Sequence, residues 1–336
     1  MEEFMDNERV ANNFRKTLEF IEPRGKTVDS YRIVDSLGGY EIELYTQAGG
    51  RFTIRTDRIS VKDMVIEGVE IPLKGVCNAL STNCLKRMIE EELGIPTDLV
   101  DGNQASIWRK LSGRRNKKHY VGRMAIVHQA ISLKIEAIVR RYNTGSFKKA
   151  LIAGEAWATV FDLPRDLKEY TKFLKDLFTP SIKKGNGEKD DNVLYEEMVE
   201  KIREVLKEYG LDLDAEEIAK TIEEYSLRIF AFLCDLFEKR GLTLADAKFE
   251  FGLIKRNGKY IVVLIDEISS DTTRIWKGLS INPGETPKGL DKDYARKSFE
   301  QKGYITPEAI RITSQSYLEF VGTMFDEPIR EEYGLA

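Results

Sequence analysis

Histidine is almost absent from this sequence, which contains only His119 and His128 among its 336 residues. This scarcity argues against metal centres built from several histidines and against nucleophile relays that need a histidine base. Cysteine is also rare. Cys77, Cys84 and Cys234 show no paired metal-ligand spacing, and their odd number does not fit the disulfide framework of a secreted protein. The cysteine content thus indicates a reducing compartment, the cytoplasm.

Long apolar runs and an excess of charge of one sign are missing too. No run reaches the roughly 18 apolar residues of a membrane-spanning helix, and the acidic start MEEFMDNERV does not resemble a signal peptide. The 52 basic and 56 acidic residues give a net charge of -4, which favours neither nucleic acid nor membrane as a partner. The basic stretch SGRRNKKH, residues 112–119, lacks interleaved aromatic residues and predicts an exposed loop rather than a nucleic-acid surface.

The length and the 42% hydrophobic content are sufficient for two domains. Between residues 31 and 71, the β-prone runs YRIV, YEIELYT and RFTIRT are separated by glycine pairs, a pattern typical of antiparallel hairpins. Residues 121–142 are strand-like again. We therefore predict a small antiparallel sheet domain over residues 1–120 and a larger α+β domain over residues 121–336.

Helices are predicted in three parts of the chain. The first covers residues 78–93, has apolar residues at helical spacing and stops at Gly94. Two more lie between residues 196 and 240, the second capped by Asp214 with Glu217 three residues later. The last helix opens at Thr306-Pro307 and continues to about residue 324.

The segment from residue 245 to residue 276 combines a hairpin signal with charged residues. Two β-prone runs flank Asn257-Gly258. In the first run Asp246, Lys248 and Glu250 alternate with apolar residues, so the two-residue period of a strand places the three charges on one face. The second run, IVVLI, should be buried and ends in an acidic pair.

An acidic pair at the end of such an apolar strand needs a cation or hydrogen bonds to offset its desolvation. A solvated hairpin face would explain Lys248 and Glu250 equally well, but it does not explain Asp266. We therefore interpret Glu250 and Asp266 as joint magnesium ligands. A strict two-residue turn would set Glu250 opposite Ile265, so this hypothesis predicts a three-residue or bulged turn with Gly258 at positive φ.

Six segments in order resemble the SAICAR synthase family, phosphoribosylaminoimidazole-succinocarboxamide synthases, in particular the longer type found in yeast and many bacteria. The segments are RGKTVDSY, TDRISVKDMVIEGVEIPLKG, EAIVRRYNTGSFKK, FTPSIKKGNGEKDDN, KFEFG with VLIDEISSDTTRIW, and DKDYARKSF. The resemblance extends from about Arg24 to Phe299 and thus covers most of the chain.

The resemblance implies an α+β fold with a small lobe like that of a kinase, a larger mixed domain, and ATP in a cleft between them. It implies an ATP-dependent ligase of purine biosynthesis that joins L-aspartate to carboxyaminoimidazole ribonucleotide and yields SAICAR, ADP and phosphate. Such a reaction brings one anion to another and needs magnesium and fixed cations. The expected partners are these small molecules, and the protein could be a monomer or a homodimer.

The resemblance also assigns residues. Glu250 and Asp266 would bind the metal, and Lys26, Lys248, Glu250 and Asp266 would contact the nucleotide. Lys248 and Arg274 are the predicted catalytic residues. The positions around the nucleotide substrate and aspartate are Arg140, Ser146, Asp190, Arg274, Lys292 and Arg296. Asp57, Arg58 and Ser60 either border the same cleft or only brace a strand end.

Several positions depart from the family pattern. Val28, His128 and Gln129 stand where basic residues are usual, Arg141 stands in place of a small residue, and ARKSF near the end replaces the more usual Arg-Asp-Trp. These departures bear on the choice of substrate more than on the type of reaction. Two alternatives therefore stay open: a diverged member that ligates another carboxylate and amine, and a nucleotide-binding protein without turnover. The retained Lys248, Glu250, Asp266 and Arg274 argue against the second.

Overall fold

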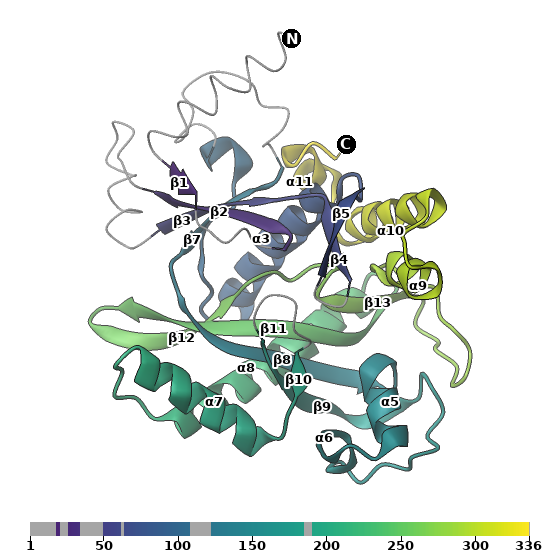
Figure 1. The fold of residues 1–336 in the computed structure, drawn as a ribbon. Helices are drawn as coiled ribbons and strands as arrows, with labels where there is room; N and C mark the ends of the chain where they lie inside the picture. The colour runs from purple at the N-terminus through teal and green to yellow at the C-terminus, as the bar shows by residue number, and fades with distance from the viewer. Residues whose placement is uncertain are drawn as a thin grey trace. The chain divides into compact units, whose positions relative to one another are not determined.

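The computed structural model describes residues 18–20, 26–33, 50–61, 64–107, 122–184 and 190–335 (Figure 1). The chain forms two compact units. The first comprises residues 1–88, 97–130 and 294–336, and the second comprises residues 89–96 and 131–293. The prediction placed the division at residues 120 and 121 and the last helix in the second domain, whereas the structure places residues 121–130 and 294–336 in the unit of the N-terminal strands. The segments 40–46 and 112–119, for which a strand and a loop were predicted, lie outside the described residues.

The first unit contains a five-stranded antiparallel sheet in the order β1-β2-β3-β7-β6 and a separate antiparallel pair, β4 and β5. Its strands are β1 (Leu18–Phe20), β2 (Val28–Ile33), β3 (Gly50–Arg55), β4 (Arg58–Val61), β5 (Met64–Glu70), β6 (Leu99–Asp101) and β7 (Met124–His128). The helix α3 (Lys74–Leu93) starts four residues before the predicted Asn78 and ends, as predicted, before Gly94 at a φ of 65°.

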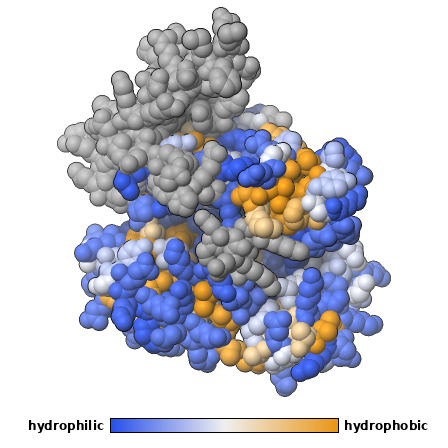
Figure 2. Space-filling view, in the orientation of Figure 1, coloured by the Kyte–Doolittle hydropathy of each residue, from blue (hydrophilic) through white to orange (hydrophobic). Residues whose placement is uncertain are grey.

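Residues from the end of the chain belong to the core around β4 and β5. Three helices follow one another there: α9 (Asp293–Lys302), α10 (Pro307–Met324) and α11 (Glu327–Glu332). Ala295, Ile305 and Ala309 pack in one cluster with Ile59 and Ile71. Thr306 accepts a hydrogen bond from the Ala309 N–H and Pro307 follows it, which confirms the predicted start of the last helix. The outer strand β5 exposes Met64 and Val65, and Figure 2 shows an apolar patch where this strand lies.

The second unit is built on a six-stranded antiparallel sheet with the path β10-β9-β8-β11-β12, to which β13 is joined through β11. The strands are β8 (Ile131–Tyr142), β9 (Lys172–Ile182), β10 (Asp191–Asn192), β11 (Leu242–Arg256), β12 (Lys259–Ile265) and β13 (Thr273–Lys277). Two short helices, α5 (Gly145–Ala153) and α6 (Ala156–Thr159), follow β8.

Two long helices, α7 (Tyr195–Glu208) and α8 (Ala215–Glu238), cover one face of this sheet (Figure 1). The Asp214 carboxylate accepts bonds from the N–H groups of Glu216 and Glu217, as the capping pattern predicted. The ring of Tyr225 on α8 contacts that of Phe251 on β11, with centroids 6.5 Å apart. Because side chains alternate along a strand, Phe251 on the helix-covered face places its neighbour Glu250 on the other face.

Candidate active site

Charged side chains share the face of the second unit's sheet that lies opposite α8. In the ladder between β11 and β8, Asp246 lies opposite Arg140 and Glu250 lies opposite Glu136. Asp246 also lies opposite Arg274 on β13. The predicted alternation along β11 is confirmed, because Lys248 contacts Glu250 at 3.5 Å on this face. Two clusters result, one near each end of the paired segments.

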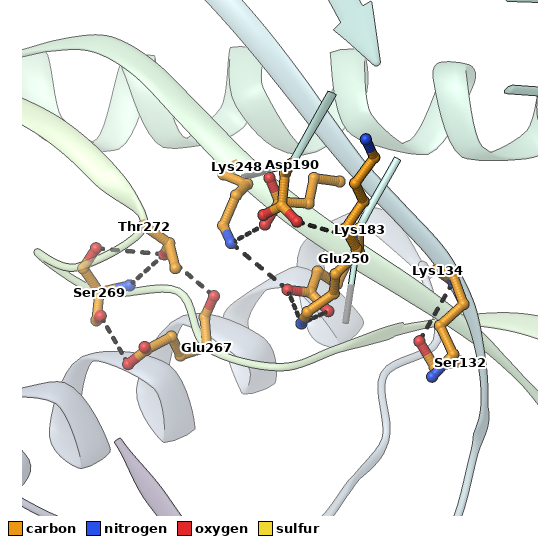
Figure 3. A network of polar contacts seen from close by, with 11 residues as sticks. Ser132, Lys134, Lys183, Asp190, Lys248, Glu250, Glu267, Ser269 and Thr272 are labelled. Atoms are coloured by element: carbon orange, nitrogen blue, oxygen red, sulfur yellow. Dashed lines mark hydrogen bonds and ion pairs between the residues drawn. The ribbon is translucent and has the colours of Figure 1, made fainter. Parts of the chain in front are cut away.

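The first group is the carboxylate–lysine cluster, formed by Glu136, Lys183, Lys248, Glu250 and Asp266. Figure 3 labels Lys183, Lys248 and Glu250 of this cluster. The ammonium of Lys183, one residue beyond β9, donates to both oxygens of Glu250 at 2.7 and 2.8 Å. Lys248 forms a hydrogen-bonded ion pair with Glu136. Both carboxylates are buried, with side chains 6% exposed at Glu250 and 8% at Glu136. Buried carboxylates of this kind need such cations to offset their lost hydration.

The turn between β11 and β12 differs from the predicted one. Arg256 pairs with Lys259 and Glu250 pairs with Ile265, so Asn257-Gly258 is a strict two-residue turn. Both turn residues have positive φ, 51° and 80°, as hairpins of this length favour. The predicted three-residue or bulged turn is therefore wrong, whereas the positive φ of Gly258 is confirmed.

Asp266 nevertheless belongs to the carboxylate–lysine cluster. Its own φ is 58°, so the chain leaves the strand conformation at this residue and the two-residue alternation ends. Its charge acts on Glu250 as well as on Lys183 and Lys248. Asp266 thus influences Glu250 without the bulged turn that was predicted.

The burial of this cluster shifts its pKa values. Burial, followed by the charge of Asp266, raises the pKa of Glu250, and the two lysines oppose the shift. Burial also raises the pKa of Glu136 against the effect of Lys248. For Lys248, burial favours the neutral amine, but Glu250 and Glu136 prevail and raise its pKa well above the ordinary value. The lysines therefore stay charged and hold the carboxylates beside them.

The second group is the arginine cluster, formed by Arg140, Ser146, Asp246 and Arg274. Arg140 is 4% exposed and donates to Thr179 at 2.9 Å and to the Ser146 hydroxyl at 3.3 Å. Arg274 donates to Asp246 at 2.7 Å. A Cβ atom at Gly145, which has a φ of 60°, would lie 2.7 Å from the Arg274 guanidinium, so only glycine leaves room for it there.

This arrangement favours a bound anion. Burial, and in part the nearby charge of Arg274, lowers the pKa of Arg140 to about 10. The buried guanidinium of Arg140 and the partly buried one of Arg274 have Asp246 between them in the ladders, and Asp293 lies 4.0 Å from Arg274. The helix α5 begins beside them at Gly145, and the side chain of Thr144 does not cap it, so its first N–H groups can also bind an anion. Guanidinium forks suit phosphate oxygens.

The carboxylate–lysine cluster fits magnesium bound together with a nucleotide. Among the described residues no group of three or more histidine, cysteine or acidic side chains is arranged to hold a metal alone. Magnesium is usually bound by one or two carboxylates together with substrate phosphates and water. Glu250 and Asp266 are such a pair and would hold it.

The structure does not bring all predicted residues into these two clusters. Asp190 accepts a bond from the Lys184 N–H at 2.8 Å, and its charge acts on Glu136. Lys292 belongs to the same unit, just before α9, whereas Lys26 and Arg296 belong to the other unit. The carbonyl oxygen of Lys26 accepts a bond from Arg58 at 3.3 Å.

The residues of the TDRIS segment are engaged within the first unit. Asp57 forms a two-pronged ion pair with Arg123 at 2.7 and 2.8 Å and accepts the Gly75 N–H at 2.8 Å. Arg58 pairs with Asp29 at 2.8 Å. These contacts brace the start of β4 and agree with the structural reading of Asp57 and Arg58.

Two departures from the family pattern also have partners. Arg141 donates to both oxygens of Asp176 at 2.9 Å and lies over the Phe230 ring of α8 at 5.4 Å. It therefore projects towards the helix-covered face, away from Arg140. Gln129 accepts a bond from Arg51 at 2.8 Å. Arg141 is thus a packing residue of the second unit.

Glu136 and Lys183 are members of the site that sequence reasoning missed. Glu136 precedes Arg140 by four residues on β8, so the two-residue period already placed both on one face. Lys183 stands in the segment FTPSIKKGNGEKDDN but offered no local signal of its own.

The family model described as SAICAR synthetase matches residues 40–310. The chain belongs to this family. One curated relative is the phosphoribosylaminoimidazole-succinocarboxamide synthase of Saccharomyces cerevisiae, 29% identical over 279 residues that cover 81% of each chain. The synthase of Elusimicrobium minutum is 30% identical over 260 residues, 75% of this chain and 79% of the relative.

Solved structures of the family show the same fold. A yeast SAICAR synthase complexed with SAICAR has a TM-score of 0.69 at 24% identity, over 92% of this chain and 95% of that one. A type-2 SAICAR synthetase in complex with ADP has a TM-score of 0.58 at 24% identity, over 91% and 97%. The predicted family, the α+β fold class and the class of enzyme, a ligase of purine biosynthesis, are confirmed. Among the described residues, each helix is too short or too polar to span a bilayer.

Proposed function

We propose that this protein joins L-aspartate to carboxyaminoimidazole ribonucleotide with the cleavage of ATP to ADP and phosphate. The observation that carries the proposal is the arrangement of two different clusters on one face of β8 and β11. Glu136 and Arg140 are four residues apart on β8, about 13 Å at the rise of a strand. A ribonucleotide can lie along this face with its phosphate at the arginine cluster and its base near the carboxylate–lysine cluster.

The residues of the site have separate roles in the proposed reaction. Arg140, Ser146 and Arg274 bind and orient the ribose phosphate, and Asp246 holds Arg274 in place. Lys248, fixed by Glu136, is the cation beside the phosphates of ATP. Glu250 and Asp266 would hold magnesium, which would supply positive charge next to the phosphates of ATP. Asp190, Lys26, Lys292 and Arg296 stay predicted ligand contacts.

The bond changes follow from this division. An oxygen of the imidazole carboxylate attacks the γ phosphorus and ADP leaves, which gives an acyl phosphate. The aspartate amine then attacks the acyl carbon, phosphate leaves and the nitrogen loses a proton. Both steps join anionic groups, so the fixed cations and the burial of the site supply the stabilisation. The three free cysteines agree with a cytoplasmic setting.

A product assay tests the proposal. ADP and the succinocarboxamide product are followed with magnesium ATP, L-aspartate and carboxyaminoimidazole ribonucleotide, and each component is omitted in turn. Product that forms only when all three are present supports the proposed reaction. ATP binding without product contradicts it and directs the search to another carboxylate or another amine.

A further inference from the structure

Lys183 is bonded to the carboxylate of Glu250, which is one of the two proposed metal ligands. Its ammonium lies 2.7 and 2.8 Å from the two oxygens of Glu250, whose side chain is only 6% exposed. The Lys183 side chain is itself 34% exposed. Lys248 pairs with Glu136 and lies 3.5 Å from one oxygen of Glu250, and Figure 3 shows Lys183 and Lys248 on either side of this carboxylate's hydrogen bonds and ion pair. Lys183 is therefore the partly exposed group that engages both oxygens of Glu250.

The backbone fixes where Lys183 begins. Its N–H donates to the carbonyl oxygen of Lys134 at 2.9 Å. Lys134 has a φ of 59° inside β8, and its own N–H donates to the Ser132 hydroxyl at 3.3 Å. A positive φ in a strand is strained for a residue other than glycine. This irregularity in β8 fixes the backbone from which the Lys183 side chain reaches Glu250.

The metal and the Lys183 ammonium compete for the same two oxygens. Both oxygens of Glu250 accept bonds from this ammonium at 2.7 and 2.8 Å, so a cation that binds both of them has to displace it. Two cations beside one buried carboxylate also repel each other. This repulsion falls when the ammonium withdraws or when an anionic phosphate arrives with the metal.

We propose that Lys183 and the divalent metal bind Glu250 in exchange, and that the released ammonium of Lys183 then contacts the nucleotide phosphates. Lys183 thus closes the metal site in the absence of nucleotide and becomes a nucleotide-binding cation in its presence. The second half of the statement rests on the proposed function, whereas the first half concerns metal binding alone.

The test measures Mn²⁺ binding to the full chain by electron paramagnetic resonance, first without nucleotide. Lys183→Met should bind Mn²⁺ about tenfold more tightly than the wild type, the change that ~1.4 kcal/mol produces. Lys183→Arg, which keeps charge and reach, should stay near the wild type. The control is Lys184→Met, since Lys184 pairs with Asp191 at 2.5 Å outside the cluster, and it should leave the affinity unchanged.

The second measurement is the affinity for ADP at saturating Mn²⁺, where Lys183→Met should bind ADP several-fold more weakly. Opposite signs for metal and ADP distinguish an exchanging cation from a structural one, because a damaged site would weaken both. Unchanged or weaker Mn²⁺ binding by a folded Lys183→Met or Lys183→Gln variant overturns the exchange. None of these measurements depends on turnover, so failure of the proposed ligase reaction is read separately in the product assay.

Discussion

The charge of Asp266 acts on Glu250 although the ladder between β11 and β12 sets Ile265, and not Asp266, opposite Glu250. The link is the φ of 58° at Asp266, which ends the alternation of the strand at that residue. Two requirements therefore meet at one position: a left-handed backbone and a negative charge. Asparagine satisfies the first and not the second, so substitutions can separate them.

Asp266→Asn should abolish turnover while the free energy of unfolding stays close to that of the wild type. Asparagine tolerates a positive φ, and only the charge that binds the metal is lost. Asp266→Ala should also be inactive, but it should lower stability by about 1 to 2 kcal/mol because alanine is strained there. Product formation and urea unfolding are the measurements. Retained turnover in Asp266→Asn would remove this residue from the metal site.

Arg274→Lys should raise the KM for the phosphorylated substrate by about ten- to a hundredfold, since the guanidinium fork contributes ~1.5 to 3 kcal/mol through charged hydrogen bonds. Gly145→Ala should act in the same direction, because its Cβ would lie 2.7 Å from the Arg274 guanidinium and φ there is 60°. The KM for ATP should change much less. Equal changes in both constants would argue against a phosphate site at these residues.

Arg141→Ala should reduce stability without changing either KM. The substitution removes the two bonds to Asp176 and the contact with the Phe230 ring, together about 1 to 2 kcal/mol. Thermal unfolding provides the measurement. Arg203→Ala is the control, because Arg203 forms an exposed ion pair with Glu200 on α7 and its loss should cost less than about 0.5 kcal/mol. A changed KM in Arg141→Ala would show that Arg141 takes part in substrate binding.

Local patterns in the sequence predicted those features that one segment determines by itself. The caps at Asp214 and Thr306, the stop at Gly94 and the shared face of Asp246, Lys248 and Glu250 each depend on neighbours along the chain. The site residues carried over by resemblance fall into the two clusters where they lie on β8, α5, β11 and β13.

The site residues that the sequence analysis did not identify contact residues that are far away along the chain. Lys183 is 67 residues from Glu250, and Glu136 is 112 residues from Lys248. Periodicity along β11 gives the face of Glu250 but not the strand that lies beside it. The turn was predicted wrongly for a related reason: only strand register was considered, whereas the chain leaves the strand conformation at Asp266, which has a φ of 58°.

The metal affinity of the carboxylate–lysine cluster should depend on pH in a defined direction. Burial in the first place, and the charge of Asp266 in the second, raises the pKa of Glu250. Only the ionised carboxylate binds a cation, so affinity for Mn²⁺ should be full at high pH. It should fall as the pH decreases through the raised pKa, above the ordinary glutamate value of about 4.3.

The stability of the fold depends on pH in the opposite direction. The contribution of Glu250 to stability is largest below the pKa that this residue has in the unfolded chain, and it declines as the pH rises through the pKa in the folded protein.

Asp266→Asn removes the second cause of the shift and leaves the first. The midpoint of the remaining weak Mn²⁺ binding should therefore move to lower pH, and Glu250→Gln should show no such midpoint in any folded sample. Mn²⁺ titrations at a series of pH values, with Lys184→Met as the control, measure both effects. A midpoint that is the same in Asp266→Asn and in the wild type would show that Asp266 does not share the electrostatic environment of Glu250.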